Sequence, residues 1–154
     1  MDLPDDLRSL EEFVQTRIPI TRAFAVRVVP HSTARFSLEA PVAINHNHVG
    51  TAFGGSIYAI MTLAAYGWLW LELRDLNPQV VVQQSSIMFL RPIRETIRAT
   101  CQPVTEKELQ VFLETLRTRG HARFTLSVTA EENGETAAVS TGTFVATVPT
   151  SPAS

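Results

Sequence analysis

Hydrophobic and polar residues in the first quarter of the chain follow first helical and then strand spacing. Apolar residues recur every three to four positions over residues 4–16, with acidic residues in the first turn, which predicts a helical segment within residues 1–20. Residues 22–29 and 34–40 each alternate apolar and polar side chains, as strands with one buried face do. Because Pro30-His31-Ser32 lies between them, we expect these two strands to form a hairpin.

The centre of the chain is a long apolar segment. A helix is predicted from about residue 54 to residue 75, and its sequence IYAIMTLAAYGWLWL is apolar all round rather than along one stripe. Such a helix is buried on every side. Its Met, Tyr and Trp residues fall on several faces, which favours core packing over a cofactor site. The apolar run is interrupted by Thr62 and Gly67 and is shorter than the roughly 20 residues of a membrane span, so we expect no membrane association.

The second half of the chain predicts two more pairs of strands around another helix. The strands are expected at residues 79–93, 94–102, 122–131 and 136–148. Thr105-Glu-Lys-Glu108 is a capping box that begins a helix ending at Gly120, and Asn133-Gly134 is the two-residue turn of a hairpin. This order predicts an α+β fold in which an antiparallel sheet wraps around the buried central helix. We expect residues 1–154 to form a single domain with a frayed tail at 149–154.

Composition and charge narrow the class of protein. The chain has 154 residues, of which 45% are hydrophobic and 18% charged, and its net charge of −2 argues against nucleic-acid binding. The single cysteine, Cys101, excludes an internal disulfide or a cysteine zinc cluster and is expected to be a small core residue. The acidic start MDLPDDL has no secretory pattern, so we expect a cytoplasmic protein. Residues 91–123 hold seven basic and four acidic residues, which form either a mildly basic face or ordinary solvated surface.

Residues 44–63, INHNHVGTAFGGSIYAIMTL, contain three glycines and two histidines but no acidic, basic or cysteine side chain. The glycine spacing matches neither a phosphate-binding loop nor a dinucleotide fingerprint. Ser56 lacks the Gly-x-Ser-x-Gly pattern, which disfavours a serine hydrolase. Two interpretations of Gly54-Gly55 stay open. The glycines either allow tight packing, or they leave the N–H groups at the helix start open to a carbonyl or oxyanion.

The polar residues of this stretch also have two interpretations each. His46 and His48 could bind a metal, but no third ligand has suitable spacing, so we expect no metal and assign them to positioning. Asn45 can donate and accept hydrogen bonds without carrying charge. Alternatively, it is an ordinary turn residue.

Three motifs together resemble a known family. They are Asn45-His-Asn-His-Val-Gly-Thr-Ala-Phe-Gly-Gly-Ser56, Tyr66-Gly-Trp68 and Ile87-Met-Phe-Leu-Arg-Pro92. They are similar to a hotdog-fold family, first described as thioesterases, whose members occur alone or behind an N-acetyltransferase domain and include malonyl-acyl-carrier-protein decarboxylases. The resemblance implies a stand-alone homodimer, or a dimer of dimers, with sites at subunit interfaces. It also implies no cofactor, because the acyl group is carried on the phosphopantetheine of acyl carrier protein or coenzyme A.

The resemblance further implies roles for individual residues. Asn45 matches the family's critical catalytic asparagine, and we expect it to orient the substrate carboxylate or to donate a hydrogen bond to an enolate. From their place at the helix start, the backbone N–H groups near Gly54 and Gly55 are expected to serve as the oxyanion hole. The residues expected to contact substrate are His46, His48, Thr51, Phe53, Ser56 and Arg91. The basic residues between 91 and 123 then become candidates for docking the acidic carrier protein or the phosphates of coenzyme A.

The lack of acids around the motif bears on the reaction. A hotdog thioesterase generally uses a carboxylate near the thioester, yet residues 40–71 contain no Asp or Glu. Decarboxylation of a malonyl thioester needs no base for its bond-breaking step. We therefore expect a malonyl-acyl-carrier-protein decarboxylase that supplies acetyl groups for the start of fatty-acid synthesis. An acyl-thioester hydrolase, with an acid such as Glu72 or Glu114 supplied by another strand or subunit, is the first alternative; a non-catalytic acyl-binding module is the second.

Overall fold

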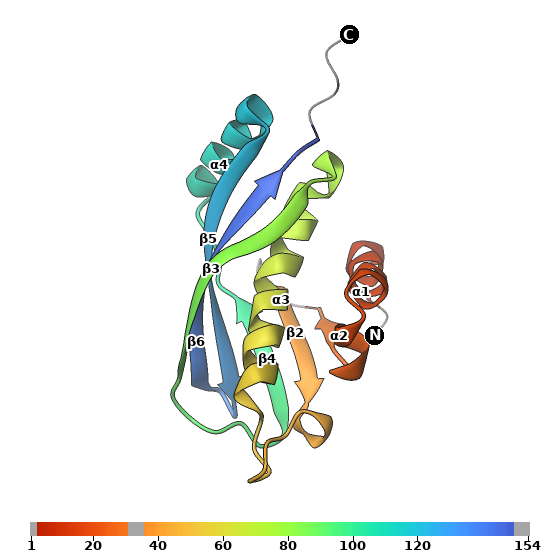
Figure 1. The fold of residues 1–154 in the computed structure, drawn as a ribbon, viewed down its shortest axis with the longest axis vertical. Helices are drawn as coiled ribbons and strands as arrows, with labels where there is room; N and C mark the ends of the chain where they lie inside the picture. Colours follow the sequence, from red (N-terminus) through yellow and green to blue (C-terminus); the bar gives the residue numbers. More distant parts are fainter. Residues whose placement is uncertain (1–2, 31–35, 150–154) are drawn as a thin grey trace.

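A curved antiparallel sheet wraps around one long helix in the computed structural model of the chain, which describes residues 3–30 and 36–149 (Figure 1). The helices are α1 (Asp5–Arg17), α2 (Ile20–Ala23), α3 (Gly54–Leu73) and α4 (Glu106–Arg119), with short 3-10 turns η1 (Val42–Ile44) and η2 (Arg74–Leu76). The strands are β1 (Arg27–Val29), β2 (Phe36–Pro41), β3 (Gln79–Phe89), β4 (Thr96–Cys101), β5 (His121–Glu132) and β6 (Glu135–Thr147). They form one six-stranded sheet in the order β1-β2-β4-β5-β6-β3. The predicted α+β hotdog architecture is confirmed.

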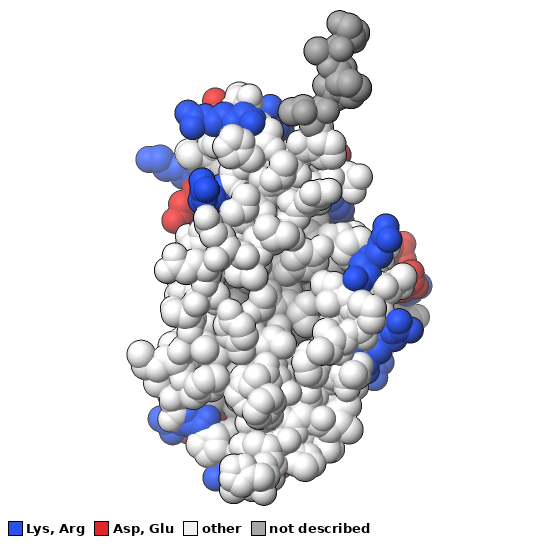
Figure 2. Space-filling view, in the orientation of Figure 1, with Lys and Arg blue, Asp and Glu red and all other residues white. Residues whose placement is uncertain are grey.

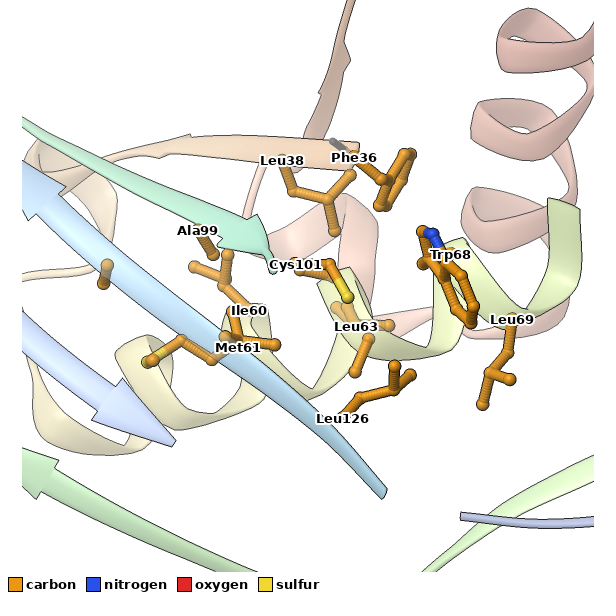
Figure 3. Packing of buried hydrophobic residues seen from close by; sticks show 14 of the residues in the cluster. Phe36, Leu38, Ile60, Met61, Leu63, Trp68, Leu69, Ala99, Cys101 and Leu126 are labelled. Atoms are coloured by element: carbon orange, nitrogen blue, oxygen red, sulfur yellow. The ribbon is translucent and has the colours of Figure 1, made fainter. Parts of the chain in front are cut away.

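The core lies between α3 and the concave face of the sheet. Ile60, Met61 and Leu69 of α3 are fully buried. They pack among the inward-facing side chains of three strands, Leu38 of β2, Ala99 and Cys101 of β4, and Leu126 of β5 (Figure 3). Cys101 is a core residue, as expected, and burial raises the pKa of its thiol to about 12. Although α3 has the length and composition of a membrane span, it is a core helix, which is consistent with a soluble protein.

The prediction that α3 is buried on every side is wrong for one stripe. Tyr58, Thr62, Tyr66 and Trp70, each four residues from the next, are only half-buried. The sheet covers the opposite side of the helix, and α1 reaches the stripe only near its end, where the rings of Phe13 and Trp70 lie 5.4 Å apart. One apolar stripe of the central helix is therefore left open in the single chain.

The predicted strand at residues 22–29 is also wrong in its first half. Residues 20–23 form α2, which ends in a Schellman motif: Val26 N–H donates to Thr21 O and Ala25 N–H donates to Arg22 O. Ala25 takes the left-handed position of this motif with φ of 52°, where glycine is usual. Because alanine gives no turn signal, alternation alone suggested a longer strand.

The two predicted hairpins and the predicted cap form, but the strands expected at residues 79–93 and 94–102 are shorter and do not pair with each other. β3 pairs with β6, and β4 pairs with β2 and β5. β1 pairs with β2 antiparallel, although the turn residues His31 and Ser32 lie outside the described residues, as does the tail from residue 150. Asn133 and Gly134 have positive φ values of 52° and 78°, as a two-residue hairpin turn requires. The capping box at α4 forms in both directions between Thr105 and Glu108, and the Thr105 hydroxyl lowers the pKa of the Glu108 carboxyl.

Strand β3 is the open edge of the sheet next to the uncovered stripe of α3. It is an 11-residue strand paired on one side with β6, and a bulge interrupts its register between Val82 and Gln84. Its exposed apolar residues are Val81, Val82, Met88 and Phe89, with Leu90 directly after the strand. A long apolar edge is a surface on which a further strand can pair.

Candidate active site

A short hairpin-like loop over residues 45–53 leads into α3. Phe53 N–H donates to Asn45 O at 2.8 Å, and Asn47 N–H donates to Thr51 O at 2.7 Å. The side chain of Asn47 holds the loop from inside, because its Oδ1 accepts from the N–H groups of Val49 and Thr51 and its Nδ2 donates to the Thr51 hydroxyl. The Thr51 hydroxyl, expected to contact substrate, thus already has a partner within the loop. The importance of Asn47 was not recognised from the sequence.

This loop is joined to the segment that follows β3. Ala52 N–H donates to Ile93 O at 2.7 Å, and Val42 N–H donates to Glu95 O at 2.9 Å. Gly54 also lies against the ring of Phe89, so two of the sequence motifs, 45–56 and 87–92, meet at one end of the molecule, the lower end in Figure 1.

The N-terminus of α3 is open. Its N-cap residue, Phe53, provides no side-chain hydrogen bond, and the first capped amide is Ile57 N–H, which donates to Phe53 O at 3.0 Å. Within residues 3–30 and 36–149, the N–H groups of Gly54, Gly55 and Ser56 have no hydrogen-bond acceptor. Gly55 is exposed and the first turn carries no acid. The positive end of the helix dipole and these amides can receive a carbonyl oxygen or an oxyanion.

Each of the two glycines also lies against an aromatic ring. A methyl group added at Gly55 would lie 2.4 Å from Cε1 of Phe53, and one added at Gly54 would lie 3.3 Å from Cζ of Phe89. Both interpretations of the glycine pair therefore agree with the structure: the pair leaves the amides open and lets two aromatic rings approach the backbone.

Asn45 is a buried link between three segments. It is 4% exposed, and its Nδ2 donates to Phe24 O and to Pro41 O, both at 2.9 Å. The two carbonyl acceptors fix the orientation of the amide, because the reverse orientation would place Oδ1 against two oxygens. Oδ1 is buried without a partner among the described residues. Donation from Asn45 to an enolate is therefore not available in this conformation, and its catalytic role stays a prediction.

The remaining expected site residues are less closely grouped. His46 and His48 are exposed, and Nδ1 of His46 lies 2.9 Å from Asn47 O. In the part of the chain that the structure describes, no three metal-ligating side chains lie together. Ser56 is buried in the first turn of α3. Arg91 follows β3 and forms an exposed ion pair with Glu135 at 2.7 Å.

The predicted basic face over residues 91–123 is not one face. Arg91 and Arg94 lie in the segment joined to the loop, whereas α4, which carries Arg117 and Arg119, lies at the opposite end of the molecule (Figure 1). Arg98 forms an ion pair with Glu39 on the neighbouring strand β2. The physical reason is that β4 and then α4 follow this segment and lead away from the loop, so the basic residues are distributed over both ends of the molecule. Of the basic residues in 91–123, Arg91 and Arg94 lie in the segment joined to the loop.

The acids considered as general bases from another strand or subunit, Glu72 and Glu114, lie far from the open helix end of their own chain. Glu72 is 18 residues along α3 from Gly54, or about 27 Å at 1.5 Å per residue. Its pKa is raised by burial and lowered in part by Arg74. Glu114 is an exposed residue of α4. Neither can reach the open helix end of its own chain.

Comparison with known proteins identifies the family of the chain. The family model described as "Putative thioesterase (yiiD_Cterm)" matches residues 7–148. The chain belongs to this family. A crystal structure of a "putative thioesterase" from Shewanella oneidensis is 29% identical, with a TM-score of 0.81, and the match covers 96% of this chain and 100% of that one.

Two more distant structures show the same fold. A protein with unknown function from Chlorobaculum tepidum has a TM-score of 0.85 at 24% identity, with 92% and 94% of the two chains covered. A thioesterase from Haemophilus influenzae has a TM-score of 0.70 at 17% identity, with 96% and 93% covered. These structures show the fold, and the family model shows the family.

The packing at the glycine pair predicts how replacing each glycine by alanine changes turnover and stability. Gly55→Ala is expected to reduce acyl-thioester turnover about tenfold, because the new methyl group displaces the Phe53 ring at the open amides. Stability should hold or rise by up to about 1 kcal/mol, since alanine favours helix. Gly54→Ala is the matched control, because its methyl group needs only a small shift of Phe89. Equal loss of turnover in both variants would contradict this account.

Proposed function

We propose that the protein decarboxylates malonyl thioesters, with malonyl-acyl carrier protein as substrate and the acetyl form as product. The observation that carries the proposal is the open, uncharged N-terminus of α3, where the amides of Gly54 and Gly55 face no acid in the first turn. The family acts on acyl thioesters by its description, and this helix end is suited to holding the oxygen of a thioester carbonyl.

In the proposed reaction, the thioester oxygen binds the N–H groups at the helix start. The bond between the methylene carbon and the carboxylate breaks, carbon dioxide leaves, and the electron pair forms an enolate whose negative charge lies on that oxygen. A proton from solvent then adds to the carbon and gives the acetyl thioester. Each backbone donor to such an oxyanion typically contributes about 3 kcal/mol to the transition state. The helix dipole adds to this stabilisation because negative charge develops at its positive end.

The charges around the site favour loss of the carboxylate. A cation held against the carboxylate would stabilise the substrate more than the transition state and slow the reaction. The stretch 44–63 contains no Lys or Arg, and Arg91 is neutralised by Glu135. Asn45 acts in this proposal by positioning the loop rather than by binding substrate, because both of its donors hold backbone carbonyls.

Thioester hydrolysis is the second candidate, and the family description favours it. Hydrolysis needs a base for water. Two acids at the same end of the molecule are already bound: Glu132 accepts from the N–H groups of Arg94 and Glu95, and Glu135 holds Arg91. The Glu95 carboxylate is exposed and has no partner among the described residues. A hydrolase would therefore depend on Glu95, on the exposed histidines or on an acid from a second subunit. A non-catalytic acyl-binding module is the third candidate and predicts binding without turnover.

We also propose that the protein is a homodimer joined along β3. The edge of β3 and the uncovered stripe of α3 lie on one side of the molecule, and Figure 2 shows that charged side chains on this side lie at its margins rather than its centre. Antiparallel pairing of two β3 strands would extend the sheet and cover both apolar features. Arg94, beside the loop, is the residue proposed to dock the acidic carrier protein or the phosphates of coenzyme A, because Arg91 is already paired with Glu135.

The test of the proposed reaction follows the mass of the carrier protein. Malonyl-carrier protein incubated with the enzyme should lose the mass of carbon dioxide and become acetyl-carrier protein, while acetyl-carrier protein stays unchanged. If free carrier thiol appears without acetyl-carrier protein, the reaction is hydrolysis and not decarboxylation. Binding of the carrier with neither product would favour the non-catalytic module.

A further inference from the structure

Two phenylalanine rings from separate parts of the chain flank the open helix end. Phe53 precedes α3 and its ring lies against Gly55, while Phe89 ends β3 and its ring lies against Gly54. Both rings are about half exposed, at 55% and 51%. Each of the two glycines at the helix start therefore has a partly exposed aromatic side chain against it.

The register of β3 explains why Phe89, and not its neighbour, reaches the helix. Phe89 pairs with Ala138, which pairs with Ala130, and both alanines are fully buried on the concave face. Met88 pairs with Val139 and points to the other face of the sheet, because successive strand residues alternate. The ring of Phe89 is therefore fixed in direction by the strand and lies over the start of α3.

A ligand with its carbonyl oxygen on the amides of Gly54 and Gly55 would lie close to both rings, because each ring lies against one of the two glycines. We expect a two- or three-carbon acyl group to bind beside the rings, and a longer chain to require the displacement of one of them. Neither ring carries a charge that would hold a substrate carboxylate.

We infer that Phe53 and Phe89 are specificity-determining residues that restrict the site at the start of α3 to short acyl groups. This inference rests on the proposed position of the thioester oxygen, but it holds for decarboxylation and for hydrolysis alike. It assigns Phe89 a role that the sequence motif does not give it. It also agrees with malonyl, a three-carbon acyl group, as the substrate.

The test uses binding, so that it does not depend on which reaction occurs. Coenzyme A thioethers that keep the carbonyl oxygen, S-(2-oxopropyl)- and S-(2-oxononyl)-coenzyme A, are titrated into the full-length protein by calorimetry. The wild type should bind the short ligand at least about tenfold more tightly, since poor accommodation of even one methylene group changes recognition about 10- to 200-fold. In Phe89→Ala this preference should fall at least about tenfold. Met88→Ala, on the opposite face of the same strand, should keep it.

A second variant is needed because Phe89 lies on β3, so replacing it could also change the dimer. Phe53→Ala lies outside β3 and should relax the same preference, and light scattering checks the oligomeric state of each variant. The inference is overturned if the wild type binds both ligands equally or binds neither, or if both phenylalanine variants keep the wild-type preference. If the protein keeps the chain-length preference but does not turn over malonyl thioesters, the proposed reaction is wrong and the inference about the two phenylalanines stands.

Discussion

Asn45→Ala is expected to reduce turnover at least about 100-fold and to lower the free energy of unfolding by about 1–3 kcal/mol. The stability loss follows from the two Nδ2 hydrogen bonds, because Phe24 O and Pro41 O would both lose a donor. Removal of the unpaired Oδ1 offsets part of that cost. The turnover loss follows from the loop, since a displacement of about 1 Å at a reacting group can cost about 100-fold. Chemical denaturation and a malonyl-thioester assay measure the two effects.

Asn45→Asp separates the positioning role from a direct one. The aspartate has nearly the same shape but faces the two carbonyls with an oxygen instead of an amide group, so it should be less stable than Asn45→Ala. Loss of turnover with unchanged stability in Asn45→Ala would mean that the side chain contacts substrate in a conformation other than this one. Near-normal turnover of Asn45→Ala would show that Asn45 neither positions the loop for catalysis nor contacts the substrate.

Val82→Lys is expected to dissociate the dimer and to abolish turnover in the same protein. Val82 lies on the concave side of the edge strand and is 43% exposed in the single chain, so a lysine there is tolerated by the monomer. In a dimer joined along β3, the two-fold axis would bury both new charges near one another, at a cost of several kcal/mol. Sedimentation should therefore show a monomer with a cooperative unfolding transition.

Val111→Lys is the matched control for this experiment. Val111 is a similarly exposed valine, but it lies on α4 away from β3, so the variant should stay dimeric and active. A dimeric Val82→Lys protein would place the interface elsewhere. A wild-type protein that is fully active as a monomer would show that the site is complete in one chain.

Elements with local signals were predictable from the sequence. The continuous apolar run gave α3, the Thr105–Glu108 box gave the start of α4, and Asn133-Gly134 gave the last hairpin. These signals act within a few residues, so no tertiary information was needed. Helix α2 was missed, and its end gives no local signal because its left-handed residue is Ala25, where glycine is usual.

The site was predictable only where the motif itself makes the contact. The open amides follow from Gly54-Gly55 at the start of an apolar helix, but the partners of the motif come from elsewhere in the chain. Asn45 binds Phe24, 21 residues away, and Arg91 is neutralised by Glu135, 44 residues away. Phe89 reaches Gly54 only because β3 lies alongside α3. Such contacts depend on strand order and register, which hydrophobic patterns do not specify.

The most direct test of the account is turnover of a malonyl thioester in heavy water, with carbon dioxide and the thioester product measured together. If the helix end stabilises an enolate that solvent then protonates, each carbon dioxide released should accompany one acetyl thioester carrying a single deuterium on its methyl carbon. Free thiol and intact malonate, with no carbon dioxide released, would contradict decarboxylation at this site.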